Sequence, residues 1–277
     1  MSIIRRVGAL AVVVVLGALL LAGCKPEPTQ PTLTPVIHPP AIATEGVLRA
    51  GVDLAYPPFG GVDQGVEAGI DIDLAAALAE RLGLTLELVS VPTTQVASAL
   101  ASGTVDIALG AIPLTDVVLA DVSSAGTYLN NGPVFFSVVA SESAAATITP
   151  EALSGMRVGV QDQSASFWKL EDEFGQGYAT SYDTLRAAFD ALGAGEVDVV
   201  VADAAVGTYI ARDYPEIGFA GQYGSAQPIG IAVRKDAGEL ETQVRSILDT
   251  LASEGVLATI TRKWLGEFPS LEVIAEQ

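Results

Sequence analysis

The chain has 277 residues, half of them hydrophobic, and its 33 Asp and Glu outnumber its 14 Lys and Arg to give a net charge of −19. This length allows one large domain or two smaller ones with separate cores. A chain so acidic and without a basic cluster repels phosphate backbones, which excludes nucleic acid as a partner. The acidic excess is otherwise typical of a solvated surface that favours solubility.

The N-terminal segment has the pattern of a secretory signal peptide. Arg5 and Arg6 precede an uncharged apolar run that ends in "LAGC", with Cys24 as its last residue. A basic start, a short apolar run and small residues before a break are typical of such peptides. An uncleaved membrane anchor is the alternative, although the run only just reaches spanning length.

"LAGC" resembles the lipobox of bacterial lipoproteins, which implies that residues 1–23 are removed and that an acylated Cys24 anchors the chain to the membrane from outside the cytoplasm. Removal leaves 12 basic against 33 acidic residues, a net charge of −21. The following residues 24–45 are rich in Pro and Thr and lack an amphipathic period, so we expect an extended tether.

Cys24 is the only cysteine and His38, in the tether, is the only histidine. An intrachain disulfide is therefore impossible. The folded part also cannot contain a Ser-His-Asp or Cys-His nucleophilic site, or a zinc site built from His or Cys. We expect neither a metal nor a cofactor.

Strand and helix patterns alternate from residue 47 onward. Asp71 is a plausible N-cap of the first helix, and Gly83 lies just beyond its end. The order β-α-β-α-β within a short stretch implies parallel strands with right-handed crossovers. The predicted elements are a strand at 47–52, a helix at 71–83, a strand at 84–89, a helix at 95–101 and a strand at 105–110.

The same order recurs later in the chain with matching residues. "RAGVD" (49–53) aligns with "RVGVQ" (157–161), and "ALASGTVDIALGA" (99–111) aligns with "ALGAGEVDVVVAD" (191–203). In the later copy, helical patterns at 166–174 and 183–193 follow the first matched stretch. Two matches in the same order predict two similar α/β lobes.

Polar and aromatic residues follow the predicted strands. Ligands of open α/β sheets bind beyond the carboxyl ends of the strands. These ends are residues 53–59 and 110–111 in the first lobe, and 161–166 and 203 in the second. We expect a binding cleft shared by the two lobes.

"LRAGVDLAYPPF", "GIDIDLAAALAERLG", "ALASGTVDIALGAI", "PIGIAVRKD" and "GVLATITRKWLG" resemble the solute-binding proteins of family 3, over residues 46–266. These are extracytoplasmic receptors that deliver polar amino acids to the permease of an ABC importer. The resemblance implies a type II periplasmic-binding-protein-like fold that closes on its ligand. It places lobe 1 at 46–133 and 228–277 and lobe 2 at 134–227, with crossing strands near 132–139 and 228–233.

The resemblance also implies ligand contacts. Tyr56 would stack on the ligand, Asp203 would pair with its α-amino group, and the turn at Ser164 would donate to a carboxylate. Without the resemblance, Asp203 would be interpreted as a helix N-cap, and Phe59 and Trp168 as core residues. The candidate ligand-binding residues are Asp53, Tyr56, Phe59, Gly110, Ala111, Ser164, Ala165, Trp168 and Asp203.

One departure from the family concerns the carboxylate site. The family usually has an arginine in the stretch that corresponds to 110–124, where this chain has neither Arg nor Lys. Ala111 and Pro113 also replace its usual hydroxyl residues. Loss of a charge-assisted contact weakens binding of an ordinary amino acid. We therefore expect a ligand with a positive amine that need not carry a carboxylate, unless Lys169 replaces the missing arginine.

Two other functions remain open at this point. A solute sensor that acts on a membrane partner is compatible with the same design. Cyclohexadienyl dehydratases share the fold, but no activated acid is evident, and we expect the protein not to be an enzyme. Assays of prephenate or arogenate turnover distinguish the enzyme from a receptor.

Overall fold

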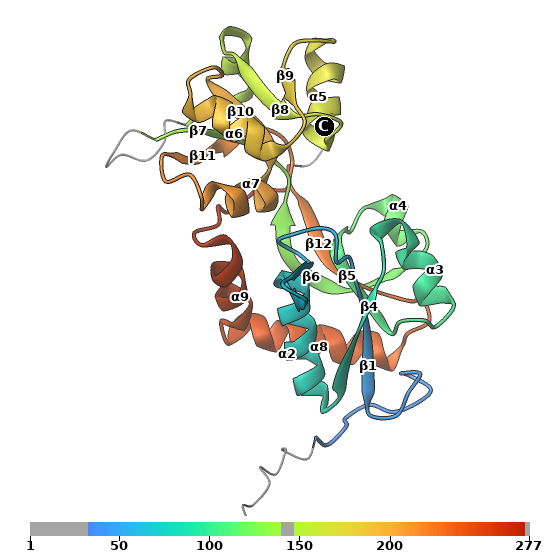
Figure 1. The fold of residues 1–277 in the computed structure, drawn as a ribbon. Coiled ribbons are helices and arrows are strands. Elements are labelled where there is room, and N and C mark those ends of the chain that lie inside the picture. The colour runs from blue at the N-terminus through green and yellow to red at the C-terminus, as the bar shows by residue number, and fades with distance from the viewer. Residues whose placement is uncertain (1–32, 140–146, 275–277) are drawn as a thin grey trace, which may run out of the picture. The chain divides into compact units, whose positions relative to one another are not determined.

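The computed structural model describes residues 33–139 and 147–274 (Figure 1). The predicted signal peptide and Cys24 lie outside the described residues. The prediction of a tether over residues 24–45 is wrong for its later part, because Ile37 and Ile42 are buried in the core of the first lobe. No helix in the described part of the chain has the length and apolar character needed to cross a membrane.

The first lobe contains a five-stranded sheet in the order β4-β1-β5-β12-β6. β1 is parallel to β4 and β5, whereas β12 runs antiparallel to β5 and β6. A small hairpin, β2 and β3, follows β1. The strands are β1 (Val47–Val52), β2 (Gly61–Asp63), β3 (Val66–Ala68), β4 (Thr85–Ser90), β5 (Ile107–Pro113), β6 (Ser123–Asn131) and β12 (Gln227–Val233).

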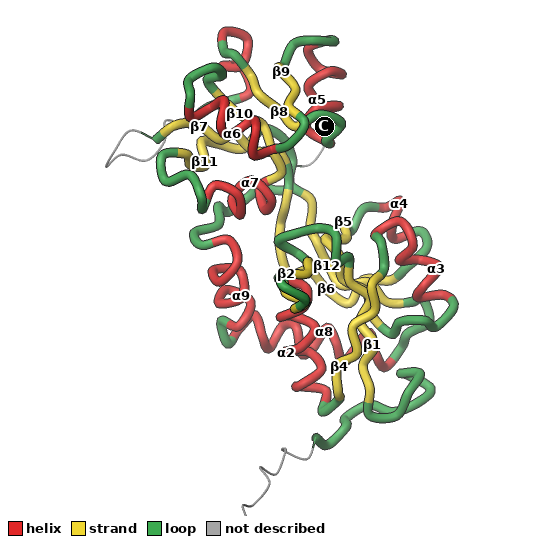
Figure 2. The backbone as a smooth tube through the Cα atoms, viewed as in Figure 1, coloured by secondary structure: helices red, strands yellow, loops and turns green. Residues whose placement is uncertain are grey.

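The second lobe repeats this arrangement. Its sheet has the order β9-β8-β10-β7-β11, with β8 parallel to β9 and β10, and β7 antiparallel to β10 and β11. Figure 2 shows the strands of both sheets in yellow. These strands are β7 (Pro133–Val138), β8 (Val158–Gln161), β9 (Thr180–Tyr182), β10 (Val199–Asp203) and β11 (Ile217–Gln222). The two similar α/β lobes predicted from the sequence are confirmed.

The repeated sequence forms the same ion pair in each lobe. In the first, the Asp106 carboxylate before β5 accepts hydrogen bonds from the backbone N–H of Arg49 (2.9 Å) and from its guanidinium (3.0 and 3.3 Å). In the second, Asp198 before β10 accepts from the backbone N–H of Arg157 (2.8 Å) and from its guanidinium. Each pair joins the start of one central strand to the start of its neighbour.

Helices cover both faces of the first sheet (Figure 1). On one face α2, α8 and α9 bury the largest core, which includes Leu74, Ile231 and Leu248. On the other face α3 packs through Val96 and Leu100. These elements are α2 (Ile70–Leu82), α3 (Val96–Ala101), α4 (Asp116–Leu119), α8 (Glu239–Ser253), α9 (Val256–Leu265) and the 3-10 helix η1 (Thr93–Gln95).

The strands of the second sheet alternate between two cores. Val200 packs with Phe189 of α6, whereas its neighbours Val199 and Val201 pack with Leu170 of α5. Successive side chains of a strand point to opposite faces, so an unbroken run of valines fills both cores. The helices are α5 (Ala165–Phe174), α6 (Leu185–Gly193), α7 (Ala204–Ala211) and the 3-10 helix η2 (Pro150–Gly155).

The prediction that Asp71 caps α2 is wrong. The helix begins at Ile70 after Gly69, which supplies no side-chain cap, and Asp71 lies in the first turn. Its carboxyl group is fully buried and accepts hydrogen bonds from Tyr128 and Ala111. An aspartate before a helical pattern is typical of an N-cap, but the Asp71 side chain makes hydrogen bonds to residues distant in the sequence instead.

The chain crosses between the sheets at Gly132 and returns over residues 223–226. All of β12 belongs to the first sheet, so the return crossing ends before the stretch 228–233. A methyl group at Gly132 would lie 2.9 Å from the Cα atom of Ala226 and 3.0 Å from the carbonyl oxygen of Ser225. The two crossing segments therefore lie so close together that a residue larger than glycine does not fit at position 132 unless the backbone moves.

A C-terminal segment, residues 271–274, runs along the return crossing. The Gln222 side chain donates to the carbonyl oxygen of Glu272 (2.7 Å) and accepts from its backbone N–H (2.9 Å). Ser225 Oγ makes a similar pair of contacts with Ile274 (3.0 and 2.9 Å), and the Leu271 side chain is buried in a core of the second lobe. The C-terminal segment is thus a third part of the junction between the sheets.

Candidate ligand-binding site

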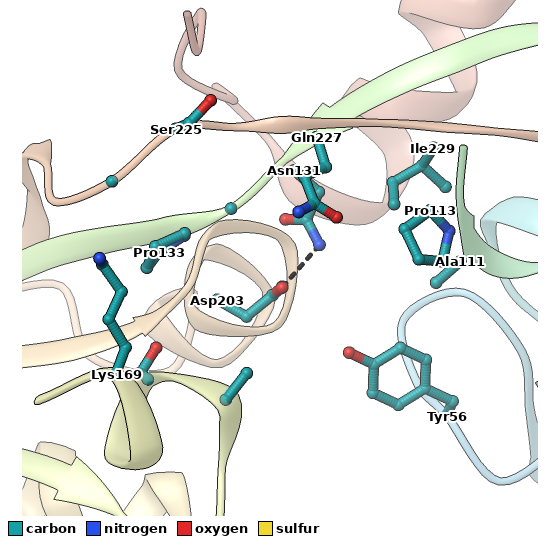
Figure 3. Close-up of a pocket in the computed structure, with 14 residues that line it drawn as sticks. Tyr56, Ala111, Pro113, Asn131, Pro133, Lys169, Asp203, Ser225, Gln227 and Ile229 are labelled. Carbon is teal, nitrogen blue, oxygen red and sulfur yellow. Dashed lines mark hydrogen bonds between the residues drawn. The ribbon is translucent and has the colours of Figure 1, made fainter. Parts of the chain in front are cut away.

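A cavity of about 470 Å³ lies at the crossing segments and at the strand ends of both lobes (Figure 3). Its walls are mainly apolar, with polar groups from each lobe. Such cavities, with a few converging polar groups, are the usual sites of small ligands. The lining residues are Tyr56, Ala111, Pro113, Asn131, Gly132, Pro133, Ala165, Ser166, Lys169, Asp203, Gly224, Ser225, Gln227 and Ile229.

Tyr56 presents an aromatic ring to the cavity from the loop after β1. Its ring stacks on Phe59 with centroids 5.6 Å apart and planes 13° apart. Phe59 is fully buried in the core of the first lobe and does not line the cavity. Partial burial, together with the charges of Asp203 and Asp53, raises the pKa of Tyr56, so the phenol remains neutral at physiological pH.

Asp203 brings a carboxylate to the cavity from the end of β10. Its Oδ1 accepts from the backbone N–H of Val206 (3.2 Å), which makes it the N-cap of α7, and its Oδ2 accepts from Asn131 Nδ2 (2.6 Å). Burial raises the pKa of Asp203 to about 6, although these hydrogen bonds favour the charged form. Above that pH the group is an anion that faces the cavity (Figure 3).

Asp53 and Gly110 lie behind the cavity wall. The Asp53 carboxylate accepts from the backbone N–H of Ala55 (3.0 Å) and from Thr93 (3.4 Å). The hydroxyl of Thr93 also donates to the carbonyl oxygen of Gly110 (3.2 Å). These contacts attach the Tyr56 loop, through Thr93, to the middle of β5, and neither Asp53 nor Gly110 is among the lining residues.

Ala111 forms part of the wall in an unusual backbone conformation. Its φ of 53° lies in the left-handed region, which residues with a Cβ atom rarely adopt. The backbone N–H of Ala111 donates to Asp71 Oδ2 (3.2 Å), and the hydroxyl of Tyr128 donates to Asp71 Oδ1 (2.6 Å). Burial raises the pKa of Asp71 to about 7. Strained backbone of this kind is concentrated at functional sites.

The start of α5 forms the opposite wall. Ser164 is the N-cap of this helix, and its hydroxyl accepts from the backbone N–H of Phe167 (3.0 Å) and donates to Gln161 (2.7 Å). Ala165 and the buried Ser166 line the cavity, whereas Ser164 does not. Trp168 is 59% exposed and lies outside the lining.

The structure thus brings Tyr56, Ala111, Ala165 and Asp203 together at the cavity. Sequence reasoning missed the lining residues in and beside the crossings, of which Asn131, Ser225 and Gln227 are polar. The sequence "NGP" at 131–133 is typical of a turn or a change of direction, but it does not indicate that the asparagine lines a cavity.

Lys169 reaches the cavity from α5. Of the described residues that line the cavity, Asp203 and Lys169 alone carry charged side chains. Figure 3 shows Lys169 beside Pro133, on the far side of Asp203 from Tyr56. Its ammonium group lies 3.7 Å from Glu173 and 5.2 Å from the ring centroid of Tyr223. The cavity therefore contains one anionic and one cationic side chain at different positions.

A profile of the bacterial extracellular solute-binding proteins, family 3, matches residues 48–267. The L-arginine-binding protein of Pseudomonas aeruginosa is 27% identical over 247 residues, which cover 83% of this chain and 92% of that protein. The L-cystine-binding protein TcyJ of Escherichia coli is 23% identical over 228 residues, covering 81% and 85%.

Solved structures agree with these matches. An ancestral cationic amino acid solute-binding protein is 26% identical and superimposes with a TM-score of 0.70, covering 79% of this chain and 96% of that one. The matched residues span both lobes described above. The chain belongs to the bacterial extracellular solute-binding proteins, family 3.

Proposed function

We propose that this protein is a lipid-anchored extracytoplasmic receptor that binds a small solute with an ammonium group and delivers it to an ABC importer. The observation that carries the proposal is the Asp203 carboxylate, which faces a cavity also lined by the Tyr56 ring. A carboxylate makes charge-assisted hydrogen bonds with an ammonium group, and an aromatic face attracts a cation. The names of the relatives support a ligand of this kind, since arginine and cystine both carry ammonium groups.

The position of Lys169 favours an amino acid over an amine without a carboxylate. Its ion pair with Glu173 is solvent-exposed, with side-chain exposures of 45% and 42%, and such pairs contribute little free energy. The ammonium group of Lys169 therefore reorients toward a ligand carboxylate at small cost. Asp203 and Lys169 then match the two charges of a zwitterion, and Lys169 takes the place of the missing arginine.

Titration calorimetry with matched ligands tests this assignment. Arginine and its decarboxylated amine are titrated into the wild type, Asp203→Asn and Lys169→Met. A charge-assisted contact contributes roughly 1.5–3 kcal/mol, so its loss weakens binding about 10- to 100-fold. Asp203→Asn should weaken both ligands, whereas Lys169→Met should weaken the amino acid alone.

Lys235→Met, at an exposed position beyond β12, is the control and should bind as the wild type does. If the amine binds the wild type more tightly than arginine does, the zwitterion assignment is wrong. If lysine, arginine, glutamine and cystine all fail to bind, an amino-acid ligand is ruled out.

The lipid anchor rests on Cys24 in "LAGC" and on the Pro/Thr-rich segment that follows. Labelled palmitate should be incorporated into the wild type, and the protein should partition with membranes. Cys24→Ser should abolish both. Partition of Cys24→Ser with membranes, together with an unlabelled wild type, would show that the protein is held there by other means.

A further inference from the structure

The side chain of Asn131 connects β6 to the acid of the cavity. Because β6 leads directly into the crossing at Gly132, it is termed the crossing strand from this point. Asn131 is the last residue of β6 and is 7% exposed. Its Nδ2 donates to Asp203 Oδ2 (2.6 Å), and its Oδ1 accepts from the backbone N–H of Ala205 (3.0 Å). With an acceptor on one side and a donor on the other, a reversed amide would lose both hydrogen bonds. The orientation of Asn131 is therefore fixed.

Asn131 and Gly132 also complete the first turn of α7. The backbone N–H of Ala204 donates to the carbonyl oxygen of Gly132 (2.9 Å), that of Ala205 to Asn131, and that of Val206 to Asp203 (3.2 Å). The first N–H groups of a helix have no partner within it, so each of these contacts satisfies a donor that would otherwise be unpaired. The cavity acid, the start of α7 and the crossing strand thus form one hydrogen-bonded unit.

Asn131 also influences the charge of Asp203. Burial favours the neutral acid, while the Asn131 amide and the backbone N–H groups of Val206 and Ala205 favour the carboxylate. The other ionisable groups that face this part of the cavity are Tyr56, from the loop after β1, and Lys169, from α5. Tyr56 stays neutral, and neither group is altered by a substitution at 131.

We propose that Asn131 is a positioning residue for ligand binding, which holds the Asp203 carboxylate charged, directed at the ligand and attached to the crossing strand. The proposal rests on the function proposed above, in which Asp203 receives the ammonium group of the ligand. It adds that the crossing strand, and not only the second lobe, determines how strongly Asp203 binds the ammonium group of the ligand.

The pH dependence of arginine binding tests this role in Asn131→Ala. Affinity in the wild type should rise through about pH 6, where Asp203 ionises, and then level off. Loss of a hydrogen bond to a charged group should move that midpoint up by about one to two pH units. Binding would then be roughly tenfold weaker at pH 6.5 and near the wild-type value at pH 8.5.

Asn130→Ala is the matched control, because Asn130 precedes Asn131 on the same strand and its side chain contacts the carbonyl oxygen of Leu271 (3.4 Å) instead. Its midpoint should equal that of the wild type. Asn131→Ser provides a second variant should the alanine variant unfold, and it should show the same upward shift. Equal weakening at every pH, with no shift, would mean that Asn131 is structural only.

A ligand-free measurement separates this proposal from the proposed function. The ¹³C resonance of the Asp203 carboxyl group, assigned by its loss in Asp203→Asn, is titrated in the wild type and in Asn131→Ala. A higher midpoint in the variant supports the role of Asn131 even if arginine fails to bind, which would overturn only the ligand assignment. An unchanged midpoint, with binding that depends on Asp203, overturns the role of Asn131 and leaves the function intact.

Discussion

Two carboxyl groups near the cavity, those of Asp203 and Asp71, differ in burial and in role. Asp203 is half-buried and faces the ligand space, whereas Asp71 has no exposed surface and supports the strained backbone at Ala111. Burial raises the pKa of Asp71 to about 7, while the hydrogen bonds from Tyr128 and Ala111 partly offset this effect. Asp71 is therefore expected to influence stability more than ligand contact.

The raised pKa of Asp71 predicts that stability falls with increasing pH. An unfolded aspartic acid titrates near 3.9, so between about pH 4 and 7 the folded state binds more protons than the unfolded state. The stabilising contribution is complete below pH 4 and is lost as pH rises through about 7. Integrated over this range, it amounts to about 4 kcal/mol.

Urea unfolding at a series of pH values from 4.5 to 8 measures this slope. Asp71→Asn cannot ionise and should give a flatter dependence than the wild type. Asp249→Asn, at an exposed position of α8, is the control and should keep the wild-type slope. A slope unchanged in Asp71→Asn would show that Asp71 is ionised in the folded protein throughout.

The sequence predicted the region of the cavity better than the position of each side chain. Tyr56 lies in the loop after β1 of the first sheet and Asp203 ends β10 of the second, so both are at carboxyl ends of strands, where ligands of such sheets bind. Asp53 and Ser164 occupy equivalent strand ends, but their oxygens bond to nearby backbone groups instead. The sequence pattern does not distinguish a side chain that stabilises a turn from one that faces a ligand.

At the scale of the elements, the Arg–Asp pairs of the two lobes differ in burial. The side chains of Arg49 and Asp106 are 16% and 5% exposed, whereas those of Arg157 and Asp198 are 58% and 38% exposed. Removal of one partner from a buried pair leaves an uncompensated charge, but an exposed pair is screened by water. Equivalent substitutions in the two lobes should therefore lower the free energy of unfolding by different amounts.

Asp106→Asn should lower the free energy of unfolding by about 3 kcal/mol, and Asp198→Asn by less than about 1 kcal/mol. Chemical denaturation of both variants at neutral pH provides the comparison, with each serving as the control for the other. Similar losses in the two would contradict the role given to burial.

The crossing segments predict a strong effect at Gly132. A methyl group there would contact backbone atoms of Ala226 and Ser225, which cannot rotate away, so Gly132→Ala should cost about 1–3 kcal/mol of stability and weaken ligand binding. Gly155→Ala is the control, because no atom lies within 4 Å of a methyl group at Gly155. Thermal unfolding and calorimetry measure the two effects. A stable Gly132→Ala protein with full affinity would show that the segments can separate.

The order of strands and helices was predictable, but the return crossing was less so. Residues 228–233 are apolar and begin with a proline, a pattern that also fits a strand leaving its sheet. Strand pairing decides whether these residues belong to the crossing or to the first sheet. Because β12 lies between β5 and β6, they belong to the first sheet. That pairing involves partners about a hundred residues away, which no local pattern reveals.

At the scale of the whole molecule, the cavity is lined by residues from both lobes and from the segments that join them. A ligand that contacts Tyr56 and Asp203 together favours arrangements in which both are within reach. We therefore expect the ligand to shift an equilibrium between open and closed lobes, as hinge motions in binding proteins do.

Small-angle X-ray scattering with and without saturating arginine measures this shift. The radius of gyration should decrease when ligand is bound, and Asp203→Asn should show no decrease at the same ligand concentration. An unchanged radius in wild type that calorimetry shows to be saturated would exclude lobe closure.

The C-terminal segment also offers a place for an optical reporter. Val273 is 57% exposed and lies between Glu272 and Ile274, which are hydrogen-bonded to Gln222 at the end of β11 and to Ser225 of the return crossing. Because Cys24 is the only native cysteine, a Cys24→Ser, Val273→Cys chain carries one thiol for a dye. Such a dye would lie beside the junction of the lobes and outside the cavity. Its fluorescence would change when the lobes close, so it would report the concentration of the bound solute.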